Sequence, residues 1–178
     1  MAQPFFTIGH GTRTIEDFVA LLKEARVSVV VDVRTMPRSR TNPQFNADQL
    51  PASLETHQIG YDHVAALGGL RAKQRTIPPA TNAFWDNQSF HNYADYAMGA
   101  TFRDALAQLR ERGESRRCAV MCAETVWWRC HRRIIADHLI AAGEQVFHIL
   151  GPNHIEAAKL TPAARIGPES TVTYPAAA

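Results

Sequence analysis

The chain has 178 residues, and its 19 Lys and Arg side chains against 17 Asp and Glu give a net charge of +2. That length suits one domain that buries enough apolar surface to fold without disulfides or metals. The net charge is too small to indicate a polyanion partner by itself. No apolar segment approaches the roughly 20 residues that span a bilayer, so we expect no membrane role.

The cysteines and the N-terminus both favour a reducing compartment. An odd number of cysteines, three, occurs close together at positions 118, 122 and 130, which does not resemble a disulfide framework. The first residues, Met1 to Pro4, lack the cationic and long apolar regions of a secretory signal. We therefore expect a cytoplasmic protein.

Apolar runs alternate with amphipathic segments along the chain. The runs predict five strands, at 5–8, 27–33, 59–64, 117–121 and 145–150. Helices are expected from Thr14, where Asp17 completes a capping-box pattern, from Asn46 toward His57 with Pro51 in the first turn or at a break, from Asn92 to Gly113, and from Ile134 to Ala142.

This alternation predicts a single Rossmann-like α/β domain over residues 1–166, with three α/β/α layers and a mostly parallel sheet of about five strands. Residues 70–90 contain few periodic apolar residues and are expected to form a lid or binding loop. Residues 167–178 are expected to form a flexible tail. Right-handed crossovers place the carboxyl ends of parallel strands at one edge, where ligand sites of such sheets lie.

Several sequence motifs resemble a bacterial family catalogued as domain of unknown function 488. They are Thr7-Ile8-Gly9-His10, Asp32-Val33-Arg34, Pro37-Arg38-Ser39, Asn42-Pro43-Gln44-Phe45, Tyr61, Leu67-Gly68-Gly69, Met121-Cys122-Ala123-Glu124 and Cys130-His131-Arg132. The resemblance covers about Phe5 to Arg165 and implies a compact cytoplasmic α/β domain. Family members are sometimes labelled DNA repair proteins. Gly11 departs from the serine expected after the Gly-His pair, and Pro51 interrupts a usually smoother helix.

Four polar residues after the strand ends are candidate catalytic groups: Glu124, His10, Asp32 and Cys122. Glu124 ranks first, because apolar neighbours such as Trp127 can raise a carboxyl pKa toward the range of a general base. Asp32 would orient or share a proton, and His10 would act as an acid. The alternative for Glu124 is a salt bridge to Arg34 or Arg129.

Basic and aromatic residues in the same loops predict recognition of phosphate and of bases. The candidate binding residues are Gly9, Arg34, Arg38, Ser39, Tyr61, Trp127, Arg129 and Arg132. The leading hypothesis is therefore hydrolysis of a phosphate-bearing small molecule or a base in nucleic acid, with N-glycosidic cleavage as one form. The alternative is an ordinary solvated rim above a core that contains the tryptophans.

Two other functions remain open from the sequence. One is a nucleotide-binding or nucleic-acid-binding module without chemistry. The other is a thiol or metal enzyme centred on Cys122, Cys130 and His131, to which His10 could add a fourth zinc ligand. The spacing from Cys122 to Arg129 is one residue too long for a phosphatase-type cradle, and the cysteine spacing matches no zinc motif. No cofactor is predicted, and zinc is the weaker alternative.

Overall fold

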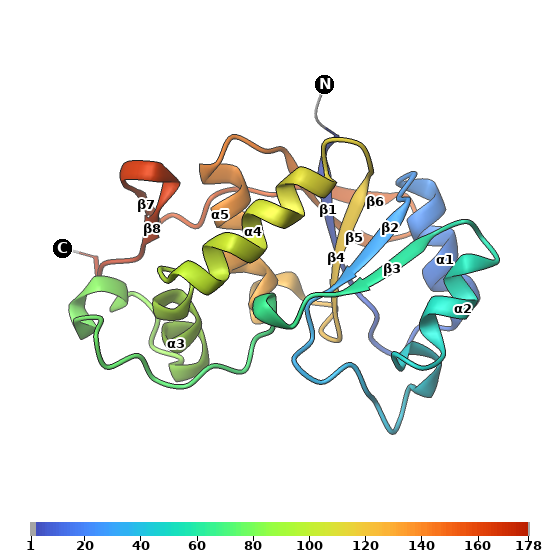
Figure 1. The fold of residues 1–178 in the computed structure, drawn as a ribbon, viewed down its shortest axis with the longest axis horizontal. Coiled ribbons are helices and arrows are strands. Elements are labelled where there is room, and N and C mark those ends of the chain that lie inside the picture. Colours follow the sequence, from blue (N-terminus) through green and yellow to red (C-terminus); the bar gives the residue numbers. More distant parts are fainter. Residues whose placement is uncertain (1–2, 178) are drawn as a thin grey trace.

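The computed structural model describes residues 3–177 and confirms the expected α/β fold. Its main sheet has the strand order β3-β2-β4-β1-β5-β6, and every pairing is parallel except that of β5 with β6. The strands are β1 (Phe5–Gly9), β2 (Val29–Asp32), β3 (Gly60–His63), β4 (Cys118–Cys122), β5 (Val146–Gly151) and β6 (His154–Ala157). Figure 1 shows this sheet between two groups of helices.

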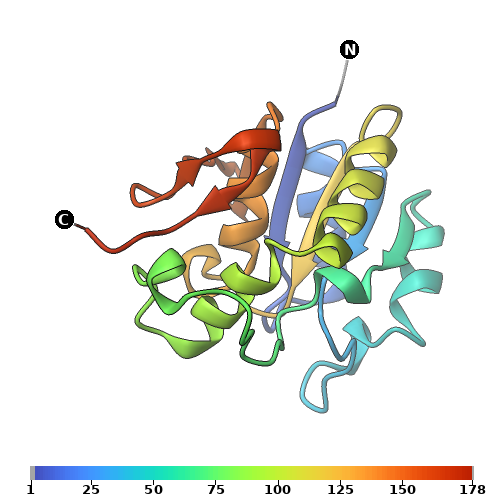
Figure 2. The same ribbon diagram turned by 60° about the vertical axis from the view of Figure 1, so that its left-hand side comes forward.

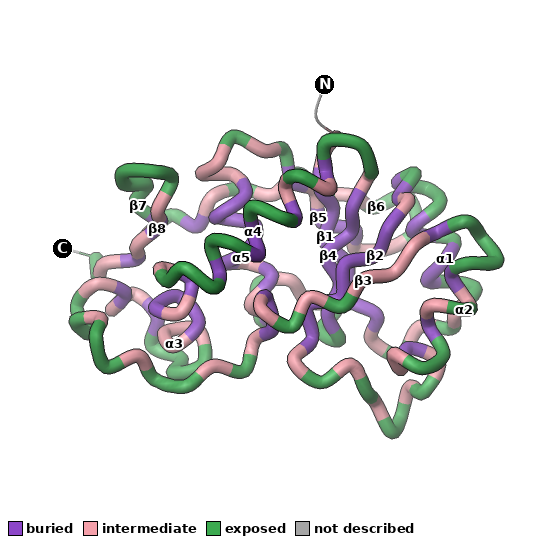
Figure 3. Tube along the Cα trace, viewed as in Figure 1, coloured by how far each residue is buried: buried purple, intermediate pink, exposed green. Residues whose placement is uncertain are grey.

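The helices cover both faces of the sheet. On one face lie α1 (Ile15–Glu24) and α2 (Leu50–Glu55), packed on β-strand residues such as Ile8 and Val30. The other face carries α3 (Gln88–Tyr96), α4 (Ala100–Arg112) and α5 (Arg132–Ala141). The central strands β1, β2 and β4 are buried on both sides, as Figure 3 shows in purple, which explains their almost unbroken apolar sequences.

Local sequence signals account for several helix ends. Thr14 accepts a hydrogen bond from the Asp17 backbone N–H and caps α1, as expected. Pro51 lies in the first turn of α2, where its missing N–H breaks no helical hydrogen bond. Asn87, and not the expected Asn92, caps α3 through the backbone N–H groups of Ser89 and Phe90.

Two expected elements differ from the structure. The single helix predicted from Asn92 to Gly113 is two helices, because α3 ends before Gly99 and Gly99 begins α4 in extended conformation. The antiparallel strand β6 was not predicted, since its sequence His-Ile-Glu-Ala has one large apolar residue and all its other residues are exposed at the sheet edge. Within residues 3–177, no helix is long and apolar enough to cross a membrane.

Short 3-10 helices occupy several loops, at Pro43–Phe45, Ala65–Leu67, Pro79–Asn82, Trp127–Arg129 and Pro168–Ser170. The predicted lid, residues 70–90, contains one of them and the first turn of α3. The lid is anchored on the body of the protein by Asn82 and Trp85, which are buried. Its first part, with Leu70 73% exposed, lies against the candidate site described below.

Part of the expected tail, residues 167–177, has secondary structure and packs on the body of the protein. Strands β7 (Arg165–Ile166) and β8 (Val172–Thr173) form a hairpin, which Figure 2 shows beside α5. Tyr174 is fully buried, and its hydroxyl donates to Asp137 Oδ2 at 2.8 Å. Its backbone N–H donates to Asn82 Oδ1 at 2.9 Å, so the tail ties the lid to α5. Ala178 lies outside the described residues.

Candidate functional site

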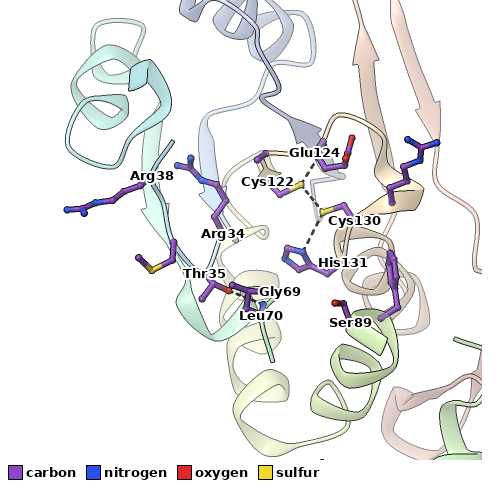
Figure 4. Close-up of a pocket in the computed structure, with 14 residues that line it drawn as sticks. Arg34, Thr35, Arg38, Gly69, Leu70, Ser89, Cys122, Glu124, Cys130 and His131 are labelled. Carbon is purple, nitrogen blue, oxygen red and sulfur yellow. Dashed lines mark hydrogen bonds between the residues drawn. The ribbon is translucent and has the colours of Figure 1, made fainter. Parts of the chain in front are cut away.

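A pocket lies beyond the carboxyl ends of β2 and β4, lined by Cys122 of β4 and by the residues that follow each strand. Gly9 pairs with Cys122, and Asp32 pairs with Met121. Beside this edge lies a cavity of about 390 Å³. Its lining residues are Arg34, Thr35, Met36, Arg38, Gly69, Leu70, Ser89, Phe90, Cys122, Ala123, Glu124, Arg129, Cys130 and His131 (Figure 4).

Arg34 is fixed at the pocket wall by a buried ion pair. Its Nε and Nη2 donate to the two carboxylate oxygens of Asp32 at 2.9 and 2.7 Å, and Nη2 also donates to the Phe45 carbonyl. The Tyr61 hydroxyl donates to the same carboxylate. Burial and this carboxylate raise the pKa of Tyr61. Asp32 and Tyr61 therefore lie behind Arg34 and do not line the pocket.

His10 also lies behind the pocket. Its Nδ1–H donates to the Gly11 carbonyl at 2.8 Å, which leaves Nε2 to accept from Arg34 Nη1 at 3.3 Å. Burial, opposed by the Gly11 hydrogen bond and reinforced by the Arg34 charge, lowers the pKa of His10. A neutral imidazole whose two nitrogens are both occupied orients Arg34. This arrangement does not suit the acid role that the sequence suggested.

Glu124 follows β4 at the pocket wall, but the apolar surroundings expected for its carboxylate are not found. The side chain is exposed, and Oε1 accepts from the Val126 backbone N–H at 3.0 Å. It forms no ion pair within residues 3–177. The backbone of Glu124 packs on Gly9, where any Cβ atom would overlap the Glu124 carbonyl oxygen. Gly9 thus allows the β4 loop to approach β1, and contact with a ligand is not needed to explain it.

Two thiols meet at the pocket floor. Cys122 ends β4, Cys130 precedes α5, and their sulfur atoms are 2.8 Å apart. Both side chains are almost fully buried, at 3% and 7% exposed. Figure 4 shows the two sulfurs facing each other above the His131 ring. This pairing brings together two of the residues proposed for the thiol alternative.

The two thiols have opposite pKa shifts. Burial favours the neutral form of Cys130, but hydrogen bonds with Cys122 and His131 and the charges of His131 and Arg132 outweigh it and lower the Cys130 pKa well below the ordinary value. Burial and the neighbouring Cys130 raise the pKa of Cys122. The two directions favour negative charge on Cys130 and the proton on Cys122.

His131 is held in place beside Cys130 by the chain on both sides. Its Nδ1 lies 3.5 Å from the Cys130 sulfur, and Nε2 lies 3.0 Å from the Val33 carbonyl, to which it donates. A Cβ atom on Gly69 would come within 2.7 Å of His131 Nδ1, so the glycine makes room for the ring. The ring therefore lies between the Cys130 sulfur and the Val33 carbonyl, with one nitrogen facing each.

Arg132, expected to bind phosphate, is buried at 1% exposure. Its Nη1 donates to Thr7 Oγ1 at 3.1 Å and Nη2 to the Glu124 carbonyl at 2.7 Å. Its Nε has no hydrogen-bond partner in the described chain, and no carboxylate pairs with it there. Arg132 therefore holds the loop that follows β4 through the Glu124 carbonyl, and its positive charge acts on Cys130.

The other predicted binding residues are divided between the pocket and its surroundings. Arg38 and Arg129 line the pocket and are exposed, without ion-pair partners in residues 3–177. Ser39 lines a neighbouring cavity, and its hydroxyl accepts from the Asn42 N–H. Trp127 stacks on His148 with ring centroids 4.4 Å apart, outside the pocket.

Sequence reasoning missed part of the pocket wall. Thr35, Ser89 and Phe90 line the cavity from the lid and from the loop after β2. The Gly68-Gly69 pair was the available signal, because two adjacent glycines mark a close approach of backbone to other groups. Among residues 3–177, no group of three His, Cys, Asp or Glu side chains is arranged to hold a metal ion.

Comparison with known proteins is consistent with the resemblance seen in the motifs. No curated protein and no solved structure matches the chain. The profile of the family described as "Domain of unknown function DUF488" matches residues 14–139, which contain β2, β3, β4 and both cysteines of the pocket. Because this match covers more than two thirds of the sequence, the chain belongs to the DUF488 family.

Proposed function

We propose that the chain is an enzyme that hydrolyses a small phosphate-bearing substrate, a nucleotide or a related base compound, with Cys130 as the nucleophile. The observation that carries the proposal is the Cys130 sulfur at the floor of the pocket, 2.8 Å from Cys122 and 3.5 Å from His131 Nδ1. This is the thiol alternative left open by the sequence, combined with the substrate class of the leading hypothesis.

Three features favour a reactive thiolate. His131 can hold the thiol proton at Nδ1 while Nε2 donates to the Val33 carbonyl. The Arg132 backbone N–H, in the first turn of α5, donates to the Cys130 sulfur at 3.4 Å. The buried Arg132 guanidinium adds a second favourable charge. Low-pKa cysteines beside a histidine or at a helix N-terminus are those that act as nucleophiles.

The substrate class follows from the walls of the pocket. The guanidinium groups of Arg38 and Arg129 lack ion-pair partners in the described chain and can bind phosphate oxygens. Phe90, Met36 and Leu70 give an apolar surface on which a base can lie. A cavity of about 390 Å³ accommodates one small molecule, which argues against a duplex as the direct occupant.

In the first step, the Cys130 thiolate attacks the electrophilic carbon or phosphorus and forms a bond to it. The leaving group departs with the electrons of the broken bond and takes a proton from His131 Nδ1. In the second step, water attacks the carbon or phosphorus, the bond to sulfur breaks, and Cys130 leaves as the thiolate. Glu124, exposed at the pocket wall, accepts the proton of that water, so the carboxylate keeps the general-base role inferred from the sequence. Glu124 then releases the proton to solvent, and His131 takes one up for the next cycle.

The proposal is tested by screening reduced protein against nucleotides, nucleosides and short single strands for product release. We expect turnover of at least one compound, loss of turnover in Cys130→Ser, and full turnover in the control Cys118→Ser. Arg129→Ala should raise KM more than it lowers kcat, because the arginine binds the ground state and the transition state alike. Ligand binding without turnover, unaffected by Cys130→Ser and weakened by salt, would support the binding-module alternative instead.

A further inference from the structure

The two pocket thiols meet from separate elements. Cys122 is the last residue of β4, and Cys130 lies beyond the 3-10 helix Trp127–Arg129. Their sulfurs are 2.8 Å apart, in direct contact, and must approach to roughly 2.05 Å to form a disulfide bond. The third cysteine, Cys118, is in the same strand as Cys122 but contacts neither sulfur.

The pair is asymmetric in its contacts. Cys130 accepts from the Arg132 backbone N–H and faces His131 Nδ1. Cys122 has no such donors, and its other contact is the Glu124 carbonyl at 3.5 Å, which can only accept. The surroundings therefore stabilise negative charge on one sulfur and a proton on the other. This is the division of roles between an attacking thiol and a resolving thiol.

The buried Arg132 guanidinium requires a nearby anion. It is 1% exposed, its Nε has no partner in residues 3–177, and no carboxylate there pairs with it. A buried charge without a countercharge is costly. A thiolate on Cys130, whose sulfur accepts from the Arg132 backbone N–H at 3.4 Å, would supply that countercharge.

Access to the thiols is narrow. Cys130 is 7% exposed and Cys122 3%, at the floor of a pocket bounded by Arg34, Gly69 and Phe90. A bulky disulfide or a partner protein cannot bring its sulfur to this depth without opening the pocket. Hydrogen peroxide, with two heavy atoms, can. The oxidant that fits is therefore a small hydroperoxide.

We propose that Cys130 and Cys122 form a peroxide-reactive dithiol that closes to a reversible intramolecular disulfide. The Cys130 sulfur attacks one oxygen of the peroxide, the O–O bond breaks, and the other oxygen leaves as water after gaining protons. The Cys122 thiol then attacks the sulfenic sulfur, the S–O bond breaks, and a second water leaves. Two thiols are oxidised and one peroxide is reduced to two waters. A small-molecule thiol reductant reverses the reaction through a mixed disulfide.

This inference rests on the same reactive Cys130 as the proposed function. It adds that peroxide and reductants would regulate the proposed activity. In the disulfide, the Cys130 sulfur is bonded to Cys122 and is no longer a thiolate, so it cannot attack a substrate and peroxide stops turnover. Cys122 also protects Cys130, because rapid ring closure prevents further oxidation to sulfinic acid. Reduction restores both thiols and the activity.

The test uses the full chain, reduced, desalted and treated with equimolar hydrogen peroxide, then alkylated and analysed by peptide mass spectrometry. We expect a Cys122–Cys130 disulfide that dithiothreitol removes, and an unmodified thiol at Cys118. Cys118→Ser, the matched control, should form the same disulfide. Cys122→Ser should accumulate sulfenic and then sulfinic acid at Cys130, and Cys130→Ser should leave Cys122 reduced. Circular dichroism of each variant checks the fold.

The inference is overturned if wild-type Cys130 goes to sulfinic acid without a disulfide, or if Cys118 is oxidised as fast as Cys130. Its failure is separable from that of the proposed function. If the disulfide forms but no substrate is turned over, the dithiol proposal stands and the hydrolase proposal fails. If turnover depends on Cys130 but continues after peroxide treatment, the hydrolase proposal stands and the dithiol proposal fails.

Discussion

The Asp32 carboxylate and the Arg34 guanidinium form a two-point ion pair, at 2.9 and 2.7 Å, with one residue between them in the chain. Asp32 is fully buried and Arg34 6% exposed. The pair leaves Arg34 one polar edge toward His10 and the pocket. Because these contacts fix the guanidinium, it forms a rigid cationic part of the pocket wall and cannot move to adjust to a ligand.

Replacing Asp32 by Asn should destabilise the protein by about 3 to 5 kcal/mol, because the buried Arg34 charge loses its countercharge. Urea unfolding at neutral pH measures the loss. The control is Asp62→Asn, which breaks the exposed ion pair of Asp62 with Arg112 and should cost about 1 kcal/mol or less. Equal losses in the two variants would show that the Asp32 pair is not buried as described.

Replacing Gly69 by Ala should make Cys130 less reactive without touching either thiol. The new methyl group would lie 2.7 Å from His131 Nδ1 and displace the ring from the sulfur. The Cys130 pKa then rises toward its ordinary value, and alkylation by iodoacetamide at pH 6 should slow by about 3- to 10-fold. Gly151→Ala, where the new methyl group meets no atom within 4 Å, should react like the wild type. Unchanged kinetics in Gly69→Ala would exclude His131 as the group that activates Cys130.

Buried His138 should make the protein acid-sensitive. Burial lowers the pKa of His138 to about 4, against about 6.5 in the unfolded chain. Between pH 6.5 and about 4, His138 is therefore protonated in the unfolded state but not in the folded state. Stability is complete above pH 6.5 and is lost as the pH falls toward 4.

The measurement compares wild type with His138→Leu by urea unfolding at pH 7 and pH 4.5. The wild type should lose about 2 to 3 kcal/mol more than the variant between the two pH values. His57, exposed after α2, provides the control, since His57→Leu should follow the wild-type profile. Parallel curves for wild type and His138→Leu would contradict the prediction.

The tail should contribute measurable stability. In Tyr174→Phe, Asp137 loses a buried hydrogen bond of 2.8 Å, which should cost about 1 to 3 kcal/mol and lower the melting temperature. Glu169→Gln, at an exposed turn of the same hairpin, should leave the melting temperature unchanged. If Tyr174→Phe melts with the wild type, the tail does not pack on α5 as described.

The sequence predicts the sheet well because its strands are buried on both faces. A nearly all-apolar run such as Val29 to Val33, interrupted by Asp32 alone, indicates a central parallel strand without any knowledge of its neighbours. The edge strand β6 lacks this signal. The docked tail depends on contacts of Tyr174 with Asn82 and Asp137, which are 92 and 37 residues away, so no local pattern predicts it.

The sequence also places the pocket at the correct edge but ranks its residues differently from the structure. Glu124 has apolar neighbours in sequence, yet the 3-10 turn at Trp127 leaves the carboxylate exposed. In the sequence, Cys130 and His131 look like residues that begin a helix. In the structure, the contacts of His131 with Val33 and Gly69 hold its ring beside the Cys130 sulfur. Those contacts join distant parts of the chain, and residue spacing does not reveal them.

The hydrogen bond from His131 Nε2 to the Val33 carbonyl joins residues 98 positions apart. It can form only after β2 has paired with β4, which requires the whole crossover through α3 and α4. On the mechanism we propose, Cys130 gains its reactivity only when this contact has formed, with native assembly. The rate of Cys130 labelling should then rise when folding is complete and can report that step.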